Sequence, residues 1–350
     1  QSPIAVAGRV LIVEKGHFFQ EIFLLVDYGE KFCYNIKYIC LLIGGYFAGC
    51  PKNLYRKFGV AMDFSVLMSV YIKENPDYLR QSLDSILNQT VLPTQIVLVE
   101  DGPLTEELDQ VIAEYKEKVP FLKLVPLKEN VGLGKALNIG LEQCDYPLVA
   151  RMDTDDIAVS TRFAEELKAF QTDPALSICG CHELEFDGDV TNVISKKAVP
   201  LTHEEIYEYA KKRNPFNHPT VMYKKQAVLD AGSYQHAMGF EDYYLWARML
   251  MNGAKGRNLD QYLLYFRTGG DMFRRRGGWK YLKSAVAVKK KIHKLGLSSY
   301  GDYLSSSMAH VAVSLMPNGL RSFVYKKTTH FTSLPFHLLF RGRKRWSFRI

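Results

Sequence analysis

The chain has 350 residues and a mass of 40.0 kDa, which suits one large domain or two small ones. Its hydrophobic content of 47% and charged content of 23% are ordinary for a globular protein, so composition excludes disorder and collagen-like architectures. Six cysteines at irregular spacing exclude a disulfide framework. Cys179 and Cys181 lie two apart, as on one face of a strand, and we find no partners that would complete a zinc site.

The net charge of +8 is located at the C-terminal end of the chain. No acidic residue follows Asp302, whereas eight lysines and arginines do, so residues 1–302 carry 37 basic and 37 acidic side chains. Aromatic residues such as Trp346 lie among these cations. This composition suits an anionic membrane surface or single-stranded nucleic acid, and a solvated basic terminus is an equal alternative. No segment reaches the ~18 apolar residues of a membrane-spanning helix.

Residues 1–61 and the rest of the chain differ in their hydrophobic pattern. The first 61 residues show no sustained period, whereas a strand pattern follows Met62 at once. We therefore expect an N-terminal extension over 1–61, outside the folded unit.

Strand and helix patterns alternate four times after Met62. The predicted strands cover 64–71, 95–100, 122–127 and 147–152, and the predicted helices cover 76–88, 104–117, 134–144 and 161–171. This alternation is typical of an α/β protein with an open, mostly parallel sheet covered by helices on both faces. Ligands bind such sheets at the carboxyl ends of the strands, so the functional residues are sought there.

Carboxylates follow two of these strands. Glu100 and Asp101 end the second strand, and Asp153, Asp155 and Asp156 follow the fourth. Each acidic turn alone is more typical of a helix N-cap than of a site. Three crowded aspartates repel one another, however, and a hard divalent cation with oxygen ligands, Mg²⁺ or Mn²⁺, would relieve that cost.

A glycine-rich segment over 130–140 resembles a phosphate-binding loop only superficially. It has neither the P-loop spacing nor a dinucleotide fingerprint in the right strand context, so both are excluded. Lys135 remains a candidate contact to a ligand, and a plain glycine-rich helix start is the alternative.

Seven segments in order over residues 62–295 together resemble the family-2 glycosyltransferases with a GT-A fold, especially bacterial exopolysaccharide enzymes of the amylovoran-biosynthesis type. They are SVLMSVY at 65–71, LDSILNQ at 83–89, VLVEDG at 97–102, NVGLGKALN at 130–138, ARMDTDDI at 150–157, NPFNHPTV at 214–221 and GFEDYYLW at 239–246. The resemblance implies a Rossmann-like GT-A domain over 62–270 and a helical, basic and aromatic region over 271–350.

The resemblance also implies roles for individual residues. Asp101 would bind the nucleobase of a nucleotide-sugar, a UDP-sugar by expectation, although a proline at 103 replaces the family's usual serine. Asp153 and Asp155 would form the DXD motif, with Asp155 on the metal and Asp153 near the ribose or the metal. Glu241 and Asp242 would supply the catalytic base, with Asp242 favoured.

Two further candidates lie in the same half of the chain. A loop over 266–279 joins paired glycines to Arg274 and Arg275, which suits closure over a diphosphate, and a solvated basic loop is the equal alternative. His218 is predicted to start a strand and to face the acceptor or the diphosphate, and a structural histidine is at least as well supported.

The sequence therefore predicts an inverting, metal-dependent glycosyltransferase that moves a sugar from a nucleotide-sugar to a glycan or lipid-linked acceptor. We expect extracellular or capsular polysaccharide synthesis, at the cytoplasmic face of the inner membrane, and no nucleic acid partner. Two alternatives remain open: a nucleotidyltransferase acting on a sugar phosphate, and a non-enzymatic membrane-associated binding protein. The first lacks a triphosphate loop after the first strand, and the second leaves the acidic residues unexplained.

Overall fold

The computed structural model describes residues 6–9, 23–26, 62–268 and 278–315. The chain divides into two compact units, Gln1–Ala61 and Met62–Ile350. In the first unit, strands β1 (Val6–Arg9) and β2 (Phe23–Val26) pair antiparallel. The second unit contains all other described elements.

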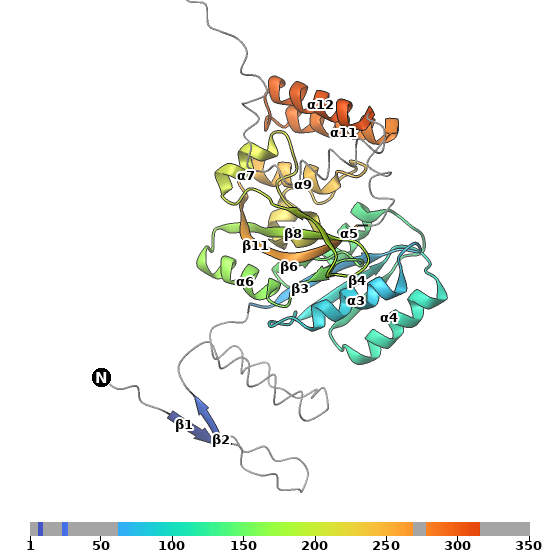
Figure 1. Ribbon diagram of the computed structural model, residues 1–350, viewed down its shortest axis with the longest axis vertical. Coiled ribbons are helices and arrows are strands. Elements are labelled where there is room, and N and C mark those ends of the chain that lie inside the picture. The colour runs from blue at the N-terminus through green and yellow to red at the C-terminus, as the bar shows by residue number, and fades with distance from the viewer. Residues whose placement is uncertain (1–5, 10–22, 27–61, 269–277, 316–350) are drawn as a thin grey trace, which may run out of the picture. The chain divides into compact units, whose positions relative to one another are not determined.

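A nine-stranded mixed sheet forms the centre of the second unit (Figure 1), with the order β5-β4-β3-β6-β10-β8-β11-β7 and β9 paired with β8. The four predicted strands are β3 (Phe64–Val70), β4 (Gln95–Glu100), β5 (Leu122–Pro126) and β6 (Leu148–Arg151). All four are parallel to their neighbours within this group. The predicted open, mostly parallel, helix-covered sheet is thus confirmed for this half.

The other half of the sheet has no counterpart among the predicted strands. Strand β10 (Met222–Lys224) runs antiparallel between β6 and β8 (Leu176–Phe186). Strand β11 (Lys255–Arg267) is parallel to β8, whereas β7 (Ile157–Ala158) and β9 (Val193–Lys197) pair antiparallel with β11 and β8. The prediction that His218 starts a strand is wrong. His218 opens the 3-10 helix η1 (His218–Thr220), because Pro219 has no N–H for a ladder and the amide of Thr220 bonds back to the carbonyl of Asn217 at 3.0 Å.

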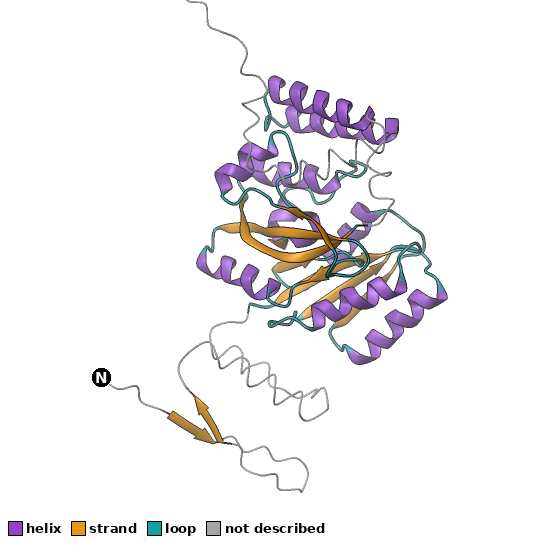
Figure 2. Ribbon diagram, in the orientation of Figure 1, coloured by secondary structure: helices purple, strands orange, loops and turns teal. Residues whose placement is uncertain are grey.

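Helices cover both faces of the sheet (Figure 2). The predicted ones begin and end within two residues of expectation, as α3 (Pro76–Leu87), α4 (Glu106–Lys118), α5 (Leu133–Glu142) and α6 (Arg162–Thr172). The others are α7 (His203–Ala210), α8 (Lys225–Asp230), α9 (Glu241–Met251), α11 (Gly278–Lys294) and α12 (Tyr300–Leu315). The last two confirm a helical C-terminal region within the described residues.

Each face of the sheet has its own apolar core. Apolar side chains of α3, α4 and α6 pack on one face, where Cys179 and Cys181 are buried as free thiols. Side chains of α5, α8, α9 and α11 pack on the other, around the fully buried Trp246. Val149 of β6 belongs to this second core. In the described ranges, no helix is both long and apolar enough to cross a bilayer.

A variant that lacks residues 1–61 is expected to fold. Phe64 and its neighbours in β3 are buried within the core of the second unit, and the regular strands and helices of that unit begin after Met62. Thermal unfolding followed by circular dichroism should show one cooperative transition within a few degrees of the full chain. Loss of that transition would place residues 1–61 in the core.

Candidate active site

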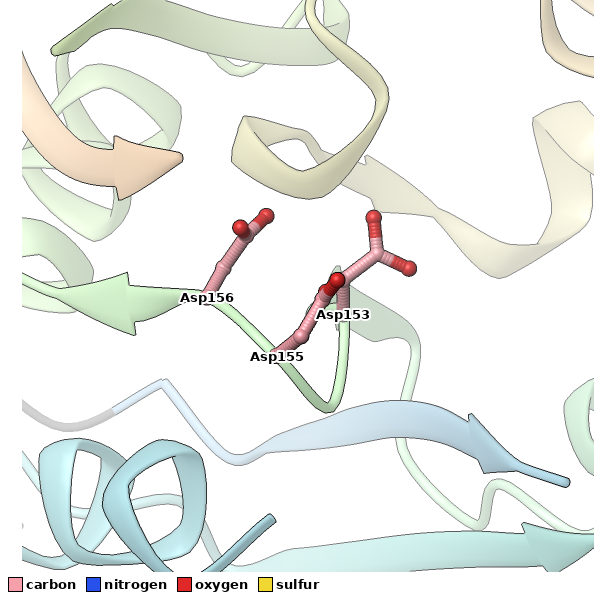
Figure 3. Close-up of side chains that lie close together, drawn as sticks. All are labelled: Asp153, Asp155 and Asp156. Atoms are coloured by element: carbon pink, nitrogen blue, oxygen red, sulfur yellow. The ribbon is translucent and has the colours of Figure 1, made fainter. Parts of the chain in front are cut away.

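Three carboxylates meet where β6 ends (Figure 3). Asp153, Asp155 and Asp156 each offer an oxygen, and these oxygens all lie within 4.8 Å of one another. The three aspartates belong to the short connection between β6, which ends at Arg151, and β7, which begins at Ile157. The acidic cluster predicted from the sequence is therefore brought together in space.

Hydrogen bonds from several elements hold this turn in place. The hydroxyl of Thr154 donates to Glu74 Oε2 at 2.6 Å, and the hydroxyl of Ser82 donates to the carbonyl of Asp153 at 2.8 Å. Arg267 on β11 donates through its backbone amide to Asp156 Oδ1 and through Nε to the carbonyl of Asp155, both at 2.8 Å. Hydrogen bonds to other elements of the fold therefore hold the three aspartates in position.

The electrostatics of the cluster favour a bound cation. Burial, together with the nearby carboxylates of Asp153 and Glu74, raises the pKa of Asp155 to about 7. Burial, followed by the charges of Asp155 and Asp153, raises the pKa of Asp156 well above its usual value. The Oδ2 atom of Asp156 has no hydrogen-bond partner in the described part of the chain. A divalent cation would stabilise the ionised carboxylates, because oxygen ligands of this kind suit Mg²⁺ and Mn²⁺. The donor set therefore fits such an ion.

The acidic cluster is paired with Arg151, the last residue of β6. Arg151 is buried to 1% exposure and forms an ion pair through Nη2 with Asp153. Its Nε and Nη1 have no partner among the described residues. Burial and then the charge of Arg151 lower the pKa of His218, whereas at Asp242, where burial raises the pKa, the charge of Arg151 opposes that rise. The sequence placed Arg151 two residues before the DXD motif, but only the fold shows which groups it faces.

The start of α9 presents the predicted catalytic base. Asp242 is partly buried, and Asn214 Nδ2 donates to its Oδ2 at 2.6 Å. Burial raises the pKa of Asp242, and hydrogen bonds from the Tyr243 amide and from Asn214 oppose that rise. Burial, reinforced by the charge of Asp242, also raises the pKa of Glu241. Asn214 is a functional candidate that sequence reasoning left without a role, although it opens one of the quoted segments.

Glu241 lies against the glycine-rich start of α5. A Cβ added at Gly134 would come within 3.3 Å of Glu241 Cγ. The amino-terminal ends of α5 and α9 therefore meet, and their positive ends suit an anionic ligand. Lys135 is exposed on the first turn of α5, close to this meeting point.

Asp101 holds the loop that precedes α5. Its Oδ1 accepts from the amide of Val131 at 2.7 Å, and its Oδ2 accepts from the amide of Gly132 and from Asn130 Nδ2, both at 3.1 Å. Gly102 has φ +89°, and a Cβ there would come within 2.6 Å of the Asn130 nitrogen. A carboxylate has about four acceptor positions. The described residues use three of them, and the fourth position lies on Oδ1.

His218 lies in an aromatic group on the same side of the sheet as α9. Its Nε2 is 2.9 Å from the hydroxyl of Tyr234, and its ring centroid is 6.0 Å from that of Trp246. Burial, followed by the charge of Arg151, lowers its pKa well below the usual value, so the imidazole is neutral at pH 7. Arg274 and Arg275, the predicted diphosphate contacts, lie outside the described residues.

Comparison with known proteins identifies the family. Residues 65–238 match the family model for glycosyl transferase family 2. The chain is 41% identical over 266 residues to the amylovoran biosynthesis glycosyltransferase AmsE of Erwinia amylovora, an overlap of 75% of this chain and 98% of that protein. The chain belongs to glycosyltransferase family 2.

A second relative of this family-2 chain has a name that states its reaction. The chain is 38% identical over 267 residues to a UDP-Gal:alpha-D-GlcNAc-diphosphoundecaprenol beta-1,3-galactosyltransferase of Escherichia coli, an overlap of 75% of this chain and 95% of that enzyme. Membership in the family confirms that the chain is of the glycosyltransferase class of enzymes. It favours sugar transfer over both alternatives left open by the sequence.

Two solved structures resemble the family-2 chain in fold. A Pyrobaculum calidifontis mannosyltransferase, PcManGT, in complex with GDP-Man and Mn²⁺ has a TM-score of 0.51 and 17% identity, and the match covers 78% of this chain and 84% of that one. S. aureus TarS 1-349 in complex with UDP-GlcNAc has a TM-score of 0.50 and 17% identity, with 78% and 73% covered. The GT-A fold predicted from the sequence is confirmed.

Proposed function

We propose that this chain is an inverting, metal-dependent glycosyltransferase that moves a sugar from a UDP-sugar to a lipid-linked or glycan acceptor in extracellular or capsular polysaccharide synthesis. One observation carries the proposal: the acidic cluster at the end of β6 is paired with the buried Arg151, and the charge of Arg151 also acts on Asp242, a partly buried carboxylate at the start of α9. Sugar transfer from a nucleotide donor requires a cation site for the diphosphate and a separate carboxylate for the proton of the attacking hydroxyl.

On the donor side, Asp155 and Asp153 would hold Mg²⁺ or Mn²⁺, which when bound neutralises the charge of the departing nucleoside diphosphate. The Mn²⁺ in the mannosyltransferase structure supports this choice of ion. The remaining acceptor position on Asp101 Oδ1 would receive an N–H of the nucleobase. Lys135, Arg274 and Arg275 would be further contacts to the diphosphate, and His218 would contact the diphosphate or the acceptor.

On the acceptor side, Asp242 would take the proton of the attacking hydroxyl. Burial raises its pKa toward the range in which a carboxylate accepts a proton effectively, while the bond from Asn214 to Oδ2 fixes the orientation of the carboxylate. Attack from the face opposite the leaving diphosphate inverts the anomeric centre. Glu241, beside the start of α5, is the alternative base.

A donor screen tests this function. Purified protein is mixed with each nucleotide-sugar, Mn²⁺ and a lipid-linked diphosphate sugar, and release of nucleoside diphosphate is measured. We expect release of UDP with transfer of the sugar and loss of both on chelation. A second mixture holds a nucleoside triphosphate and a sugar 1-phosphate in place of the nucleotide-sugar, and release of pyrophosphate from it would indicate a nucleotidyltransferase. Release of nothing in either mixture would leave a binding protein.

We also propose a peripheral position on the cytoplasmic face of the inner membrane. The outward side of α11 exposes Trp279, Lys280, Lys283 and Lys290, and the ammonium of Lys283 lies 5.7 Å from the centre of the Trp279 ring. An exposed aromatic residue among lysines suits an anionic lipid surface. The E. coli relative, whose name gives a diphosphoundecaprenol substrate, supports this position. The eight charges after Asp302 all lie outside the described residues and are a second proposed contact.

Replacing Lys280, Lys283 and Lys290 by glutamine should weaken binding to acidic vesicles. Each lysine near such a surface contributes ~1 kcal/mol, so the triple change should lower vesicle affinity by about 100-fold. The effect should fade in salt, because surface charges are screened within ~10 Å at 0.1 M. Flotation with phosphatidylglycerol vesicles measures it.

The matched control carries the same triple change at exposed lysines away from α11, namely Lys118, Lys128 and Lys168. It should bind vesicles nearly as well as the wild type. Equal weakening by both triple variants would show that net charge, and not this helix face, attracts the membrane.

A further inference from the structure

A buried ammonium lies between α11 and the end of α7. Lys289 on α11 is 5% exposed, and its Nζ donates to the backbone carbonyl of Lys212 at 3.0 Å. Within the described ranges it forms no ion pair. The carboxylate of Asp302 pairs instead with Lys212 Nζ at 3.0 Å and accepts from Ser299. A buried ammonium that lacks an anionic partner is costly.

Two other basic side chains surround Lys289. Burial and then the charge of Arg213 lower the pKa of Lys289 to about 8. Burial, followed by the charges of Lys289 and Arg213, lowers the pKa of His310 to about 4. These three side chains, from α11, α12 and the segment after α7, therefore lie close together. Arg213 is exposed, so the group opens to solvent on one side.

This cationic cluster is connected to the start of α9 in two places. Arg213 directly precedes Asn214, whose amide holds Asp242 at 2.6 Å. The ring of His310 lies 6.0 Å from that of Phe240, which directly precedes Glu241. The cluster is thus connected to the start of α9 both through Asn214 and through Phe240. Figure 1 shows α11 and α12 on the same side of the unit as α9.

We propose that Arg213 and Lys289 form an anion site for the diphosphate group of a lipid-linked sugar acceptor. This inference rests on the function proposed above and names its acceptor class. A phosphate oxygen would give Lys289 the anionic partner that the described residues do not provide, and the fork of Arg213 suits a diphosphate. The first sugar of such an acceptor would then place its hydroxyl at Asp242, one sugar ring away from the diphosphate.

The position of the cluster favours the acceptor over the donor. The donor diphosphate belongs with the cation at Asp155, at the end of β6. The cluster lies among α11, α12 and the segment after α7, and it contacts the start of α9 through Phe240. Arg213 and Lys289 are therefore placed to select acceptors by their diphosphate.

The test compares two acceptors that differ only in the diphosphate. One is a short-chain lipid diphosphate sugar and the other is the same sugar as an alkyl glycoside. In the wild type, kcat/KM for the lipid diphosphate sugar is divided by kcat/KM for the alkyl glycoside. In Arg213→Gln this ratio should fall by ~10- to 100-fold, because a charge-assisted contact to phosphate is lost. Lys289→Met, which keeps the length and the packing of the side chain, should lower the same ratio.

Arg257→Gln is the matched control, since Arg257 is an exposed arginine on β11. It should keep the wild-type ratio. An unchanged ratio in Arg213→Gln and Lys289→Met would overturn the proposal, as would a loss of affinity for the UDP-sugar in calorimetry, which would assign the cluster to the donor. The two variants could also lose activity equally with both acceptors, but only when phosphatidylglycerol vesicles are added. That result would show that lipid headgroups occupy the cluster. Failure of the proposed function is distinct, because the wild type would then transfer sugar to neither acceptor.

Discussion

Asp242→Asn is expected to lower turnover by ~10²-fold or more while the affinity for donor stays near that of the wild type. The substitution keeps the shape of the side chain and an oxygen that can accept from Asn214, whose Nδ2 lies 2.6 Å from Oδ2 in the wild type. It removes only the ability to take a proton. A turnover assay paired with calorimetric titration of donor and Mn²⁺ measures both quantities.

Glu241→Gln is the matched control for this variant. Glu241 occupies the neighbouring position at the start of α9, and its pKa is raised by burial as well. We expect a smaller loss of turnover in this variant than in Asp242→Asn. The reverse order would move the base to Glu241, and normal turnover by both variants would show that neither residue is the base.

Asp155→Ala should abolish metal-dependent binding of the donor. Asp155 is central to the acidic cluster, and without its carboxylate the diphosphate loses the cation that holds it. We expect donor affinity in the presence of Mn²⁺ to fall by ~10²-fold or more, to the level of the wild type in a chelator. Calorimetry with UDP-sugar measures this directly. Asp230→Ala removes an exposed carboxylate at the end of α8 and should bind donor as the wild type does.

The stability of Asp155→Ala separates lost binding from lost folding. The pKa of Asp155 rises from 3.8 to about 7 on folding, so without metal its ionisation costs the folded state free energy. That cost is absent below pH 4 and grows as the pH rises toward 7. The metal-free variant should therefore unfold no more easily than the metal-free wild type at pH 7. A lower unfolding temperature there would attribute the lost binding to structural damage.

The sequence by itself determined the parallel half of the sheet and the acidic cluster. The apolar runs of β3, β4, β5 and β6 and the stripes on the intervening helices are local patterns, and each element packs close to its neighbours in the chain. Asp153 and Asp155 needed only the end of β6 to be brought together. Such short-range information is readable from periodicity and spacing.

The tertiary structure decided the rest of the sheet and the partners of the site residues. Strand β10 pairs Met222 with Ala150, and Asn214 reaches Asp242 across 28 positions in the chain. Asp101 uses most of its acceptor positions on a loop that follows it by about 30 residues. Each of these contacts joins segments that are distant in sequence, and side-chain packing around Trp246 selects among the many pairings that local pattern allows. Local periodicity carries no information about that choice, because the same apolar alternation suits many strand partners and registers.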